Sequence, residues 1–523
     1  MFEAFQKGIP LIDIGDIKQG LATADNNRFL RQWFEVNTSN INFSCGSCDE
    51  SKNSDLKWYP YNKGGNFKKW YGNQNYIINW KRDGFEVRSF KKSVIRNSNF
   101  YFHESLSWSK ISSGSIGFRF FPKGFLFDVA GCSVFVDKNR DYILGFLNSN
   151  VSKDIFNLIS PTLNYEVGHV SSVPLIFEDN DEIRIYVREN IEICKNDWDD
   201  YETSWEFKSH PFLRFKRSTL EESFNAWKEH KSHDFNKLQS NEIELNKIFS
   251  QIYSIDVDPN VEDKYVSVTK ADYESDVKSF ISYAVGCMLG RYSLDEEGIA
   301  FAGGEFNLNN YSKYTPDDDN VIPVLDTGYF EDDIVGRFVE FVKTSFGEEV
   351  LELNLDFIAA GLKNKGNTSR EVIRNYFLND FFKDHAKTYQ KYPIYWQFDS
   401  GKENGFKCLI YLHRYEPNLV ARVRTDYLHK TQKKIEENLT NCENVIQGSS
   451  NKSEVAKSVK LKNKLIKQLT EIKTYDEALA HIANQNIEID LDDGVKVNYE
   501  KFQNVELHTE GQKDKKINLL KKI

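Results

Sequence analysis

The stretch KWYPYNKGGNFKKWYGNQNYIINW, residues 57–80, combines aromatic rings with lysines and is interrupted by glycine and asparagine. Its short aromatic and β-branched runs, such as YIINW at 76–80, are typical of strands. Gly64 and Gly65 favour a tight turn between two of these runs. The stretch therefore predicts a small antiparallel sheet that carries many rings.

Similar runs continue along the chain and extend the predicted sheet. They are GFEVRSF (84–90), IGFRFF (116–121) and LFDVAGCSVFV (126–136), with a hairpin turn expected at Asp83 and Gly84. Apolar residues then recur four apart at Ile143, Leu147 and Val151, which indicates a helix within 141–156. We therefore predict that residues 1–180 form a β-rich domain closed by a helix.

The rest of the chain favours helices. At 523 residues it exceeds the size that one core serves. Residues 181–260 are predicted to form an acidic linker and helical spacer, in which Ser218 and Glu221 have the spacing of a capping box. A long helix or a helical pair is expected there.

Two further segments complete the predicted α+β fold. Residues 261–415 predict a mixed α/β domain with helices at 272–289, 331–346 and 368–390, the last opened by a capping box at Thr368 and Glu371, and with a β-hairpin formed by 393–398 and 406–415. Residues 416–523 predict a helical hairpin, in which 418–440 pairs with 452–473, and a C-terminal tail.

Charge is distributed unevenly along the chain. The net charge of -10 argues against nucleic acid, because a duplex repels an acidic surface. Between Lys57 and Arg119, however, twelve Lys and Arg stand against three acids, a segment charge of +9, so that the remainder carries -19. Fifteen rings lie among these cations, which suits phosphate and base-edge contacts. An ordinary half-exposed sheet with a solvated lysine face has the same composition.

The opening loop GDIKQGLATADNNRFLRQWFEV (15–36) also has two interpretations. Asn26 and Asn27 could pair with adenine edges, and Arg28 or Arg31 with guanine or phosphate. Alternatively, Asp25 and the two asparagines form a turn followed by a helix cap, since Asp and Asn are the usual residues for both purposes.

The seven cysteines and the hydropathy indicate a cytoplasmic protein that does not contact a membrane. The cysteines are odd in number and mostly isolated, which favours reduced thiols over a disulfide framework. No apolar run approaches the roughly 20 residues of a membrane span. Cys45 and Cys48 have the spacing of half a zinc site, but a second pair is missing, so two free thiols in a surface loop are favoured over a metal.

The sequence fits one catalytic pattern superficially and lacks another. Asp197, Asp199 and Asp200, followed by Glu206 and Lys208, superficially fit the acids and lysine of a magnesium nuclease. The Gly-rich turn of an S-adenosylmethionine fold is missing, and so is the Asn/Asp-Pro-Pro-aromatic loop that grips a flipped adenine, because all eleven prolines are isolated. No catalytic residue of methyl transfer is therefore assigned to this chain.

Long motifs along the chain resemble one family. They include the opening loop, residues 57–80, ESLSWSKISSG (104–114), ILGFLNS (143–149), DWDDYETSWEF (197–207), YAVGCMLGRYSLDEEG (283–298), FEDDIVGRFVEFV (330–342), REVIRNYFLNDFFKDHAKTYQKYPIYW (370–396) and IDLDDGVKVNY (489–499). Together they resemble the C-terminal half of the adenine-specific DNA methyltransferases of bacterial BREX phage-defence systems (PglX). The resemblance covers essentially the whole chain.

The resemblance implies a target-recognition domain within residues 15–180 that reads a short asymmetric sequence in double-stranded DNA. It implies partners in an N-terminal methyltransferase domain or subunit and in other BREX proteins, with S-adenosylmethionine as the cofactor of that catalytic domain and no cofactor in this chain. The start at Met1 then fits an expressed fragment, a split gene or a silent specificity cassette. The expected DNA contacts are Asn26, Asn27, Arg28, Lys68, Lys69, Arg82, Arg88, Lys91, Lys92, Arg96 and Arg119. A protein-interaction adaptor and a magnesium-dependent nuclease remain as alternatives.

Overall fold

The computed structural model describes residues 2–112, 114–160, 162–507 and 515–523. The chain forms two compact units, each of which is discontinuous in sequence. Unit 1 comprises Met1–Trp33, Thr38–Phe207 and Ala226–Ala271, and unit 2 comprises Phe34–Asn37, Lys208–Asn225 and Asp272–Ile523. The predicted boundaries near residues 180, 260 and 415 stay a prediction. Each unit is described by itself.

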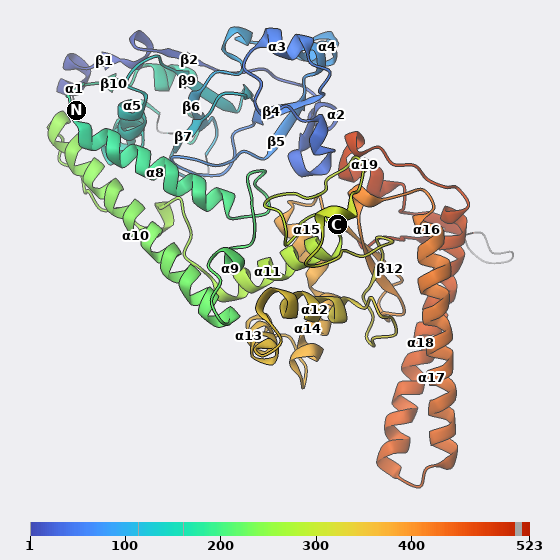
Figure 1. The fold of residues 1–523 in the computed structure, drawn as a ribbon. Helices are drawn as coiled ribbons and strands as arrows, with labels where there is room; N and C mark the ends of the chain where they lie inside the picture. Colours follow the sequence, from blue (N-terminus) through green and yellow to red (C-terminus); the bar gives the residue numbers. More distant parts are fainter. Residues whose placement is uncertain (1, 113, 161, 508–514) are drawn as a thin grey trace. The chain divides into compact units, whose positions relative to one another are not determined.

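Unit 1 contains two four-stranded sheets and one short strand pair (Figure 1). The first sheet is antiparallel throughout and has the order β2 (Asp16–Lys18), β9 (Gly131–Phe135), β6 (Ser105–Ser109) and β7 (Phe118–Phe121). The second has the order β3 (Leu30–Gln32), β5 (Tyr76–Asn79), β4 (Trp58–Asn62) and β8 (Leu126–Phe127), with β4 and β8 parallel. The remaining pair is β1 (Ile9–Pro10) with β10 (Pro174–Leu175).

Both sheets are rich in buried rings, as the composition predicts. Every residue of β4 is buried, including Trp58, Tyr59 and Tyr61. Such strands are covered on both faces, which explains why residues 57–62 lack the alternation of a half-exposed sheet. The predicted strands at 76–80, 116–121 and 126–136 are confirmed in β5, β7, β8 and β9. Strands are thus concentrated in the first 180 residues, but they are short and α-helices hold more of these residues, so the segment is mixed α+β in place of β-rich.

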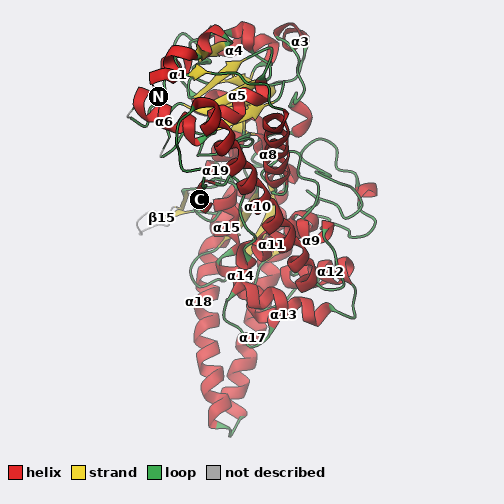
Figure 2. Cartoon of the chain, turned by 90° about the vertical axis from the view of Figure 1, so that its left-hand side faces the viewer, coloured by secondary structure: helices red, strands yellow, loops and turns green. Residues whose placement is uncertain are grey.

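Helices surround the strands of unit 1 (Figure 2). They are α1 (Phe2–Lys7), α2 (Asn26–Phe29), α3 (Cys48–Asn53), α4 (Lys81–Ser89), α5 (Arg140–Leu147), α6 (Asn150–Ile159), α7 (Val167–Ser171), α8 (Asp181–Asp199) and, from Ala226 onward, α10 (Leu220–Tyr253). The helix predicted within 141–156 is two helices, because the Ser149 side chain accepts a hydrogen bond from the Ser152 amide and starts α6.

The predicted strand at 84–90 is wrong, because residues 84–89 belong to α4. Arg82, Asp83 and Gly84 have positive φ angles of 51°, 54° and 70°, so the expected hairpin turn is a left-handed kink at the start of the helix. The Asp83 carboxylate accepts a hydrogen bond from Trp80 Nε1 at 3.2 Å and pairs with Arg88. These local contacts override the β propensity of the segment.

Unit 2 is mainly helical. It contains α9 (Pro211–Arg214), α11 (Tyr273–Met288), α12 (Ile334–Phe346), α13 (Leu351–Leu362), α14 (Ser369–Asn379), α15 (Phe381–Thr388), α16 (Leu419–Arg422), α17 (His429–Gly448), α18 (Lys452–Ala483) and α19 (Gly494–Glu500). Strand β13 (Lys407–Tyr411) lies between β11 (Ile322–Pro323) and β12 (Tyr395–Asp399), and β14 (Val505–Leu507) pairs with β15 (Lys515–Ile517).

Most of the elements predicted for unit 2 are confirmed. The β-hairpin is β12 with β13, and the capping box at Thr368 is present, since its side chain accepts from the Glu371 amide. The predicted helix 368–390 is divided at Asp380 into α14 and α15. Helix α13 is not among the helices predicted from the sequence. The capping box predicted at Ser218 and Glu221 is displaced by one residue. Thr219 caps α10 in place of Ser218, because its hydroxyl accepts a hydrogen bond from the Glu222 amide.

The helical hairpin is also confirmed. Residues 423–428 form a π-helical turn that joins α16 to α17, and Ser449 lies in the turn before α18. In Figures 1 and 2 the turn end of the hairpin lies away from the remaining helices of unit 2. Within the described ranges, none of the helices combines the length and apolar character that crossing a bilayer requires.

The left-handed kink of α4 generates a stability prediction. A Cβ at Gly84 would lie 2.6 Å from two carbons of the Trp80 ring, and φ there is +70°. Gly84→Ala should therefore destabilise the protein by about 1–3 kcal/mol, measured by urea unfolding. Gly168→Ala, whose Cβ would meet nothing within 4 Å, should stay close to the parent protein. Equal stability of the two variants would contradict the left-handed kink.

Candidate nucleic-acid interface

The eleven residues expected to contact DNA do not lie on one sheet. They divide into two groups within unit 1, one around α2 and α4 and the other around the loop 63–70 and β7. The first group contains Asn26, Asn27, Arg28, Arg82, Arg88, Lys91, Lys92 and Arg96, and the second contains Lys68, Lys69 and Arg119. The prediction of a single cationic sheet is therefore wrong, because residues 81–96 form a helix and a loop.

Tertiary contacts bring the opening loop beside the segment 81–97. Ala22 and Val94 exchange two backbone hydrogen bonds of 2.9 Å. Phe29 packs on Phe90 with 5.5 Å between ring centroids, and Asn97 donates to the Gln19 carbonyl at 2.9 Å. The opening loop and the segment 81–97 thus form one surface.

Two aromatic rings hold the Arg28 side chain on this surface. Its guanidinium carbon lies 5.0 Å from the Phe29 ring centroid and 5.4 Å from that of Phe90. The residue is exposed, and no carboxylate pairs with it within the described part of the chain. A guanidinium stacked in this way keeps its donors directed outward at low entropy cost. Phe90 was not identified from the sequence, where its ring is one of fifteen.

The two asparagines have different surroundings. The Asn26 side-chain oxygen accepts a hydrogen bond from the Thr23 hydroxyl at 2.6 Å, whereas no bond to the exposed Asn27 amide is recorded among the described residues. Asp25 caps α2 by accepting from the Arg28 amide. The cap interpretation of this loop is thereby confirmed, and it leaves Asn27 available for a further partner.

The cations of the 81–96 segment are mostly exposed. Arg82, Lys91 and Lys92 have exposed side chains with no ion-pair partner in the described ranges. Arg88 pairs with Asp83 at 3.0 Å and lies over the Trp80 ring, and Arg96 is half-buried. Three exposed cations without an ion-pair partner within eleven residues make this segment a polyanion-binding candidate.

The second group faces the interior. Lys69 is buried, and its ammonium lies 2.8 Å from Glu242 Oε2 on α10. Trp70 Nε1 donates to the other oxygen of the same carboxylate at 2.6 Å. Lys68 donates to the Ser267 carbonyl at 2.5 Å. These lysines tie the loop 63–70 to the second half of unit 1.

Arg119 is also buried and is only 1% exposed. Its guanidinium donates to Ser109 Oγ at 3.2 Å, and burial lowers its pKa to about 10, so the group stays charged at pH 7. Arg119 presents almost no surface to a ligand, and the small exposed part of Lys69 faces a cavity. Neither residue therefore belongs to the surface formed by the first group.

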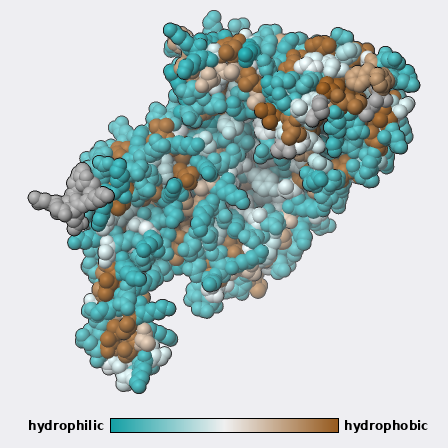
Figure 3. Space-filling model, turned by 180° about the vertical axis from the view of Figure 1, so that it is seen from behind, coloured by the Kyte–Doolittle hydropathy of each residue, from teal (hydrophilic) through white to brown (hydrophobic). Residues whose placement is uncertain are grey.

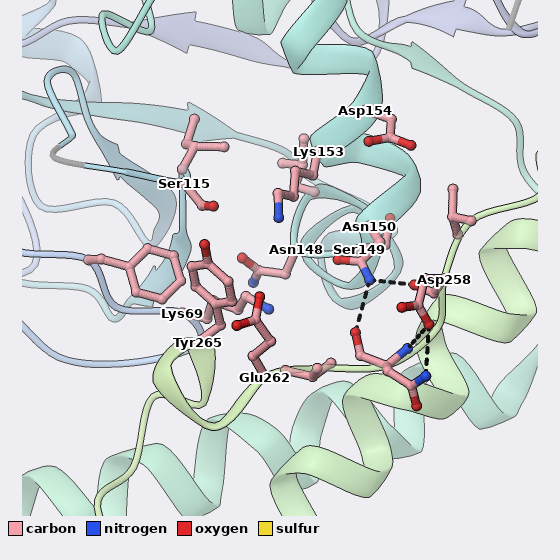
Figure 4. Close-up of a pocket in the computed structure, with 16 residues that line it drawn as sticks. Lys69, Ser115, Asn148, Ser149, Asn150, Lys153, Asp154, Asp258, Glu262 and Tyr265 are labelled. Atoms are coloured by element: carbon pink, nitrogen blue, oxygen red, sulfur yellow. Dashed lines mark hydrogen bonds between the residues drawn. The ribbon is translucent and has the colours of Figure 1, made fainter.

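A cavity of about 320 Å³ lies beside Lys69 (Figure 4). Lys153 and Lys69 line it together with Asp154, Asp258 and Glu262. Asn150, at the start of α6, uses its side-chain amide to bond the Asp258 carbonyl at 2.8 Å. Because three carboxylates line this cavity against two lysines, it is poorly suited to phosphate.

The other candidate residues have structural roles. Cys45 is fully buried and Cys48 is half-buried, so the prediction of two free thiols in a surface loop is corrected in part. Burial raises the pKa of each thiol to about 11.

Two acidic residues of the predicted nuclease pattern form ion pairs. Asp197 pairs with Lys231, and Asp199 pairs with Lys195 at 2.6 Å. Within the described residues, no group of three or more His, Cys, Asp or Glu side chains could hold a metal.

Comparison with known proteins gives two extensive matches. The chain is 41% identical over 512 residues to the adenine-specific methyltransferase PglX of Lacticaseibacillus casei (strain Zhang), and the match covers 94% of this chain and 42% of that protein. It is 36% identical over 508 residues to the adenine-specific methyltransferase BrxX of Escherichia coli O9:H4 (strain HS), covering 91% and 41%. No family model matches the chain.

The chain is homologous to the PglX and BrxX adenine-specific methyltransferases. It spans about 42% of the length of the PglX protein that it matches. The resemblance seen in the sequence motifs is confirmed over nearly the whole chain. The shares covered are consistent with a correspondence to the C-terminal portion of PglX and BrxX.

The buried pair at Lys69 generates a second prediction. Glu242→Ala would leave the Lys69 ammonium and the Trp70 indole without their acceptor in the interior, so it should destabilise unit 1 by about 3–5 kcal/mol. Glu244→Ala removes a partly exposed partner of Lys247 from the same helix and should cost about 0.5 kcal/mol. Thermal and urea unfolding of both variants measure the difference, and similar losses would contradict a buried role for Glu242.

Proposed function

We propose that unit 1 binds double-stranded DNA through the surface around α2 and α4 and serves as the target-recognition part of a site-specific adenine-N6 methyltransferase of a BREX phage-defence system. This α2–α4 surface is defined by Asn27, Arg28, Arg82, Arg88, Lys91, Lys92 and Arg96. The observation that carries the proposal is that exposed cations from two distant stretches converge on one surface of a protein whose net charge is -10.

The residues of this surface supply two kinds of DNA contact. Lys91 and Lys92 are point charges on flexible stems, which suits phosphate contacts that position the duplex without reading its sequence. Arg28 is held by two rings and Asn27 carries an available amide, so these two residues suit bidentate contacts to guanine and adenine edges. Each such pair contributes roughly 1–3 kcal/mol of discrimination.

Methyl transfer is proposed to require residues outside this chain. The Gly-rich turn and the Pro-Pro loop that adenine methylation uses are missing from the sequence, and the matched relatives named as methyltransferases are more than twice as long. The proposed partners are an N-terminal methyltransferase domain or subunit that binds S-adenosylmethionine, together with other BREX proteins. Recognition then offsets the few kcal/mol needed to flip the target adenine out of the stack.

Charge reversal on the α2–α4 surface should weaken DNA binding. Lys91→Glu, Lys92→Glu and Arg96→Glu together should raise Kd on every duplex and reduce the slope of log K against log salt by about 2–3, since each phosphate contact contributes about 0.9. Fluorescence anisotropy across a salt series measures both quantities.

A matched control carries the same change of charge elsewhere in unit 1. Lys123, Lys138 and Lys228 are exposed lysines without an ion-pair partner in the described ranges, and their triple reversal to Glu should change Kd far less. Equal losses in the two triple variants would refute a localised surface and indicate only a general effect of net charge.

A second experiment tests whether methyl transfer requires residues outside this chain. The chain incubated with S-adenosylmethionine and duplex DNA should transfer no methyl group, whereas addition of the N-terminal methyltransferase portion of a matched relative should give N6-methyladenine at one sequence motif. Methylation by the chain alone, detected by sequencing of modified DNA, would overturn this assignment. The motif obtained would also define the recognised sequence.

A further inference from the structure

The second helix of the hairpin in unit 2 is strongly basic. Between Lys452 and Lys473, α18 carries seven lysines against two glutamates, a net charge of +5, and over its full length to Ala483 the net charge is +3. The neighbouring helix α17 is balanced, because His429–Gly448 contains three lysines and three glutamates. Because α17 and α18 pack together but only α18 has an excess of positive charge, the packing of the hairpin does not account for that charge.

Four of these lysines share one face of α18. Lys457, Lys460, Lys464 and Lys467 are spaced three, four and three residues apart, which places them within an arc of roughly 80° over about 15 Å of helix. Lys464 pairs with Asp326. The other three are exposed, and no carboxylate pairs with them within the part of the chain that the structure describes.

The hairpin holds this lysine stripe on a rigid support. Leu465 and Ile472 of α18 are buried, as are Ile435 and Cys442 of α17. Figures 1 and 2 show the two helices running side by side. The stripe therefore lies on a packed helix, and the positions of its backbone atoms do not depend on a ligand.

The residues that border the lysines are mostly small or polar. On the helical projection, Ala456 and Asn463 border the lysines on one side and the exposed Leu461 borders them on the other, whereas the exposed Val459 and Ile466 project from another side. Figure 3 shows that hydrophilic residues predominate on the face of the molecule in that view, with a hydrophobic patch near the turn end of the hairpin. Protein–protein interfaces are enriched in aromatic residues and depleted of lysine, so this composition favours a phosphate backbone over a protein partner.

We infer that the lysine stripe of α18 is a second DNA-binding surface, which contacts the phosphates of a duplex without regard to sequence. The inference rests on the proposed function in that it takes DNA as the ligand of the chain. It adds a site in unit 2 that is separate in sequence from the α2–α4 surface. Charge complementarity and the lack of rings on the stripe carry the argument.

The test compares two triple variants of the full chain. Lys457→Glu, Lys460→Glu and Lys467→Glu change the stripe, and Lys430→Glu, Lys433→Glu and Lys434→Glu make the same change of charge on α17, where all three lysines are exposed. The α18 variant should bind duplexes of unrelated sequence about tenfold or more weakly and lose about 2–3 from the salt slope, while the α17 variant stays within about threefold of the parent chain. Circular dichroism and thermal unfolding should be unchanged in both variants.

The outcomes separate this inference from the proposed function. Normal binding by the α18 variant, together with weak binding by the Lys91, Lys92 and Arg96 variant, would overturn the stripe and leave the α2–α4 surface intact. Equal losses in the α17 and α18 variants would also overturn it. If poly-glutamate binding depended on the α18 lysines while duplex binding did not, the stripe would belong to an acidic protein partner. A parent chain that binds no duplex would overturn both assignments.

Discussion

The arrangement of unit 1 depends on two buried hydrogen bonds that the Glu242 carboxylate of α10 accepts. The carboxylate accepts one hydrogen bond from the Trp70 indole at 2.6 Å and one from the Lys69 ammonium at 2.8 Å, and it is almost fully buried. A buried carboxylate with both oxygens satisfied is tolerated, whereas the same groups left unpaired in the interior are strongly destabilising. This carboxylate therefore fixes the loop 63–70 against a helix that lies 170 residues further along the chain.

Burial and pairing in the interior also determine which cations are able to bind a polyanion. Lys69 and Arg119 are as basic in the sequence as Lys91 and Lys92, yet the first two are buried and the second two are exposed. A lysine that neutralises an interior carboxylate cannot release counterions from DNA, because its charge is already compensated. The proposed DNA-binding surface consists mainly of cations that form no buried pair, such as Arg28, Lys91 and Lys92.

Local backbone geometry makes the same surface possible. Three successive left-handed residues at the start of α4 turn the helix so that Val87 is buried while Arg82 and Phe85 remain exposed. The turn is held by the Trp80 indole and the Asp83 carboxylate. Phe90, which follows α4, then meets the Phe29 ring and supports the Arg28 guanidinium. Strained backbone of this kind is commonly retained where it positions side chains for a ligand.

The sequence by itself determined the α+β class, the ring-rich strands, the cap at Thr368 and the helical hairpin, because each follows from local periodicity, propensity or capping within about a dozen residues. It also carried the homology to PglX and BrxX. Only the tertiary structure decided that residues 81–89 form a helix and that Arg28 joins Lys91 and Lys92 on one surface while Lys69 pairs with Glu242. Burial and pairing depend on contacts between residues far apart in the chain, and a linear pattern of charges does not contain them.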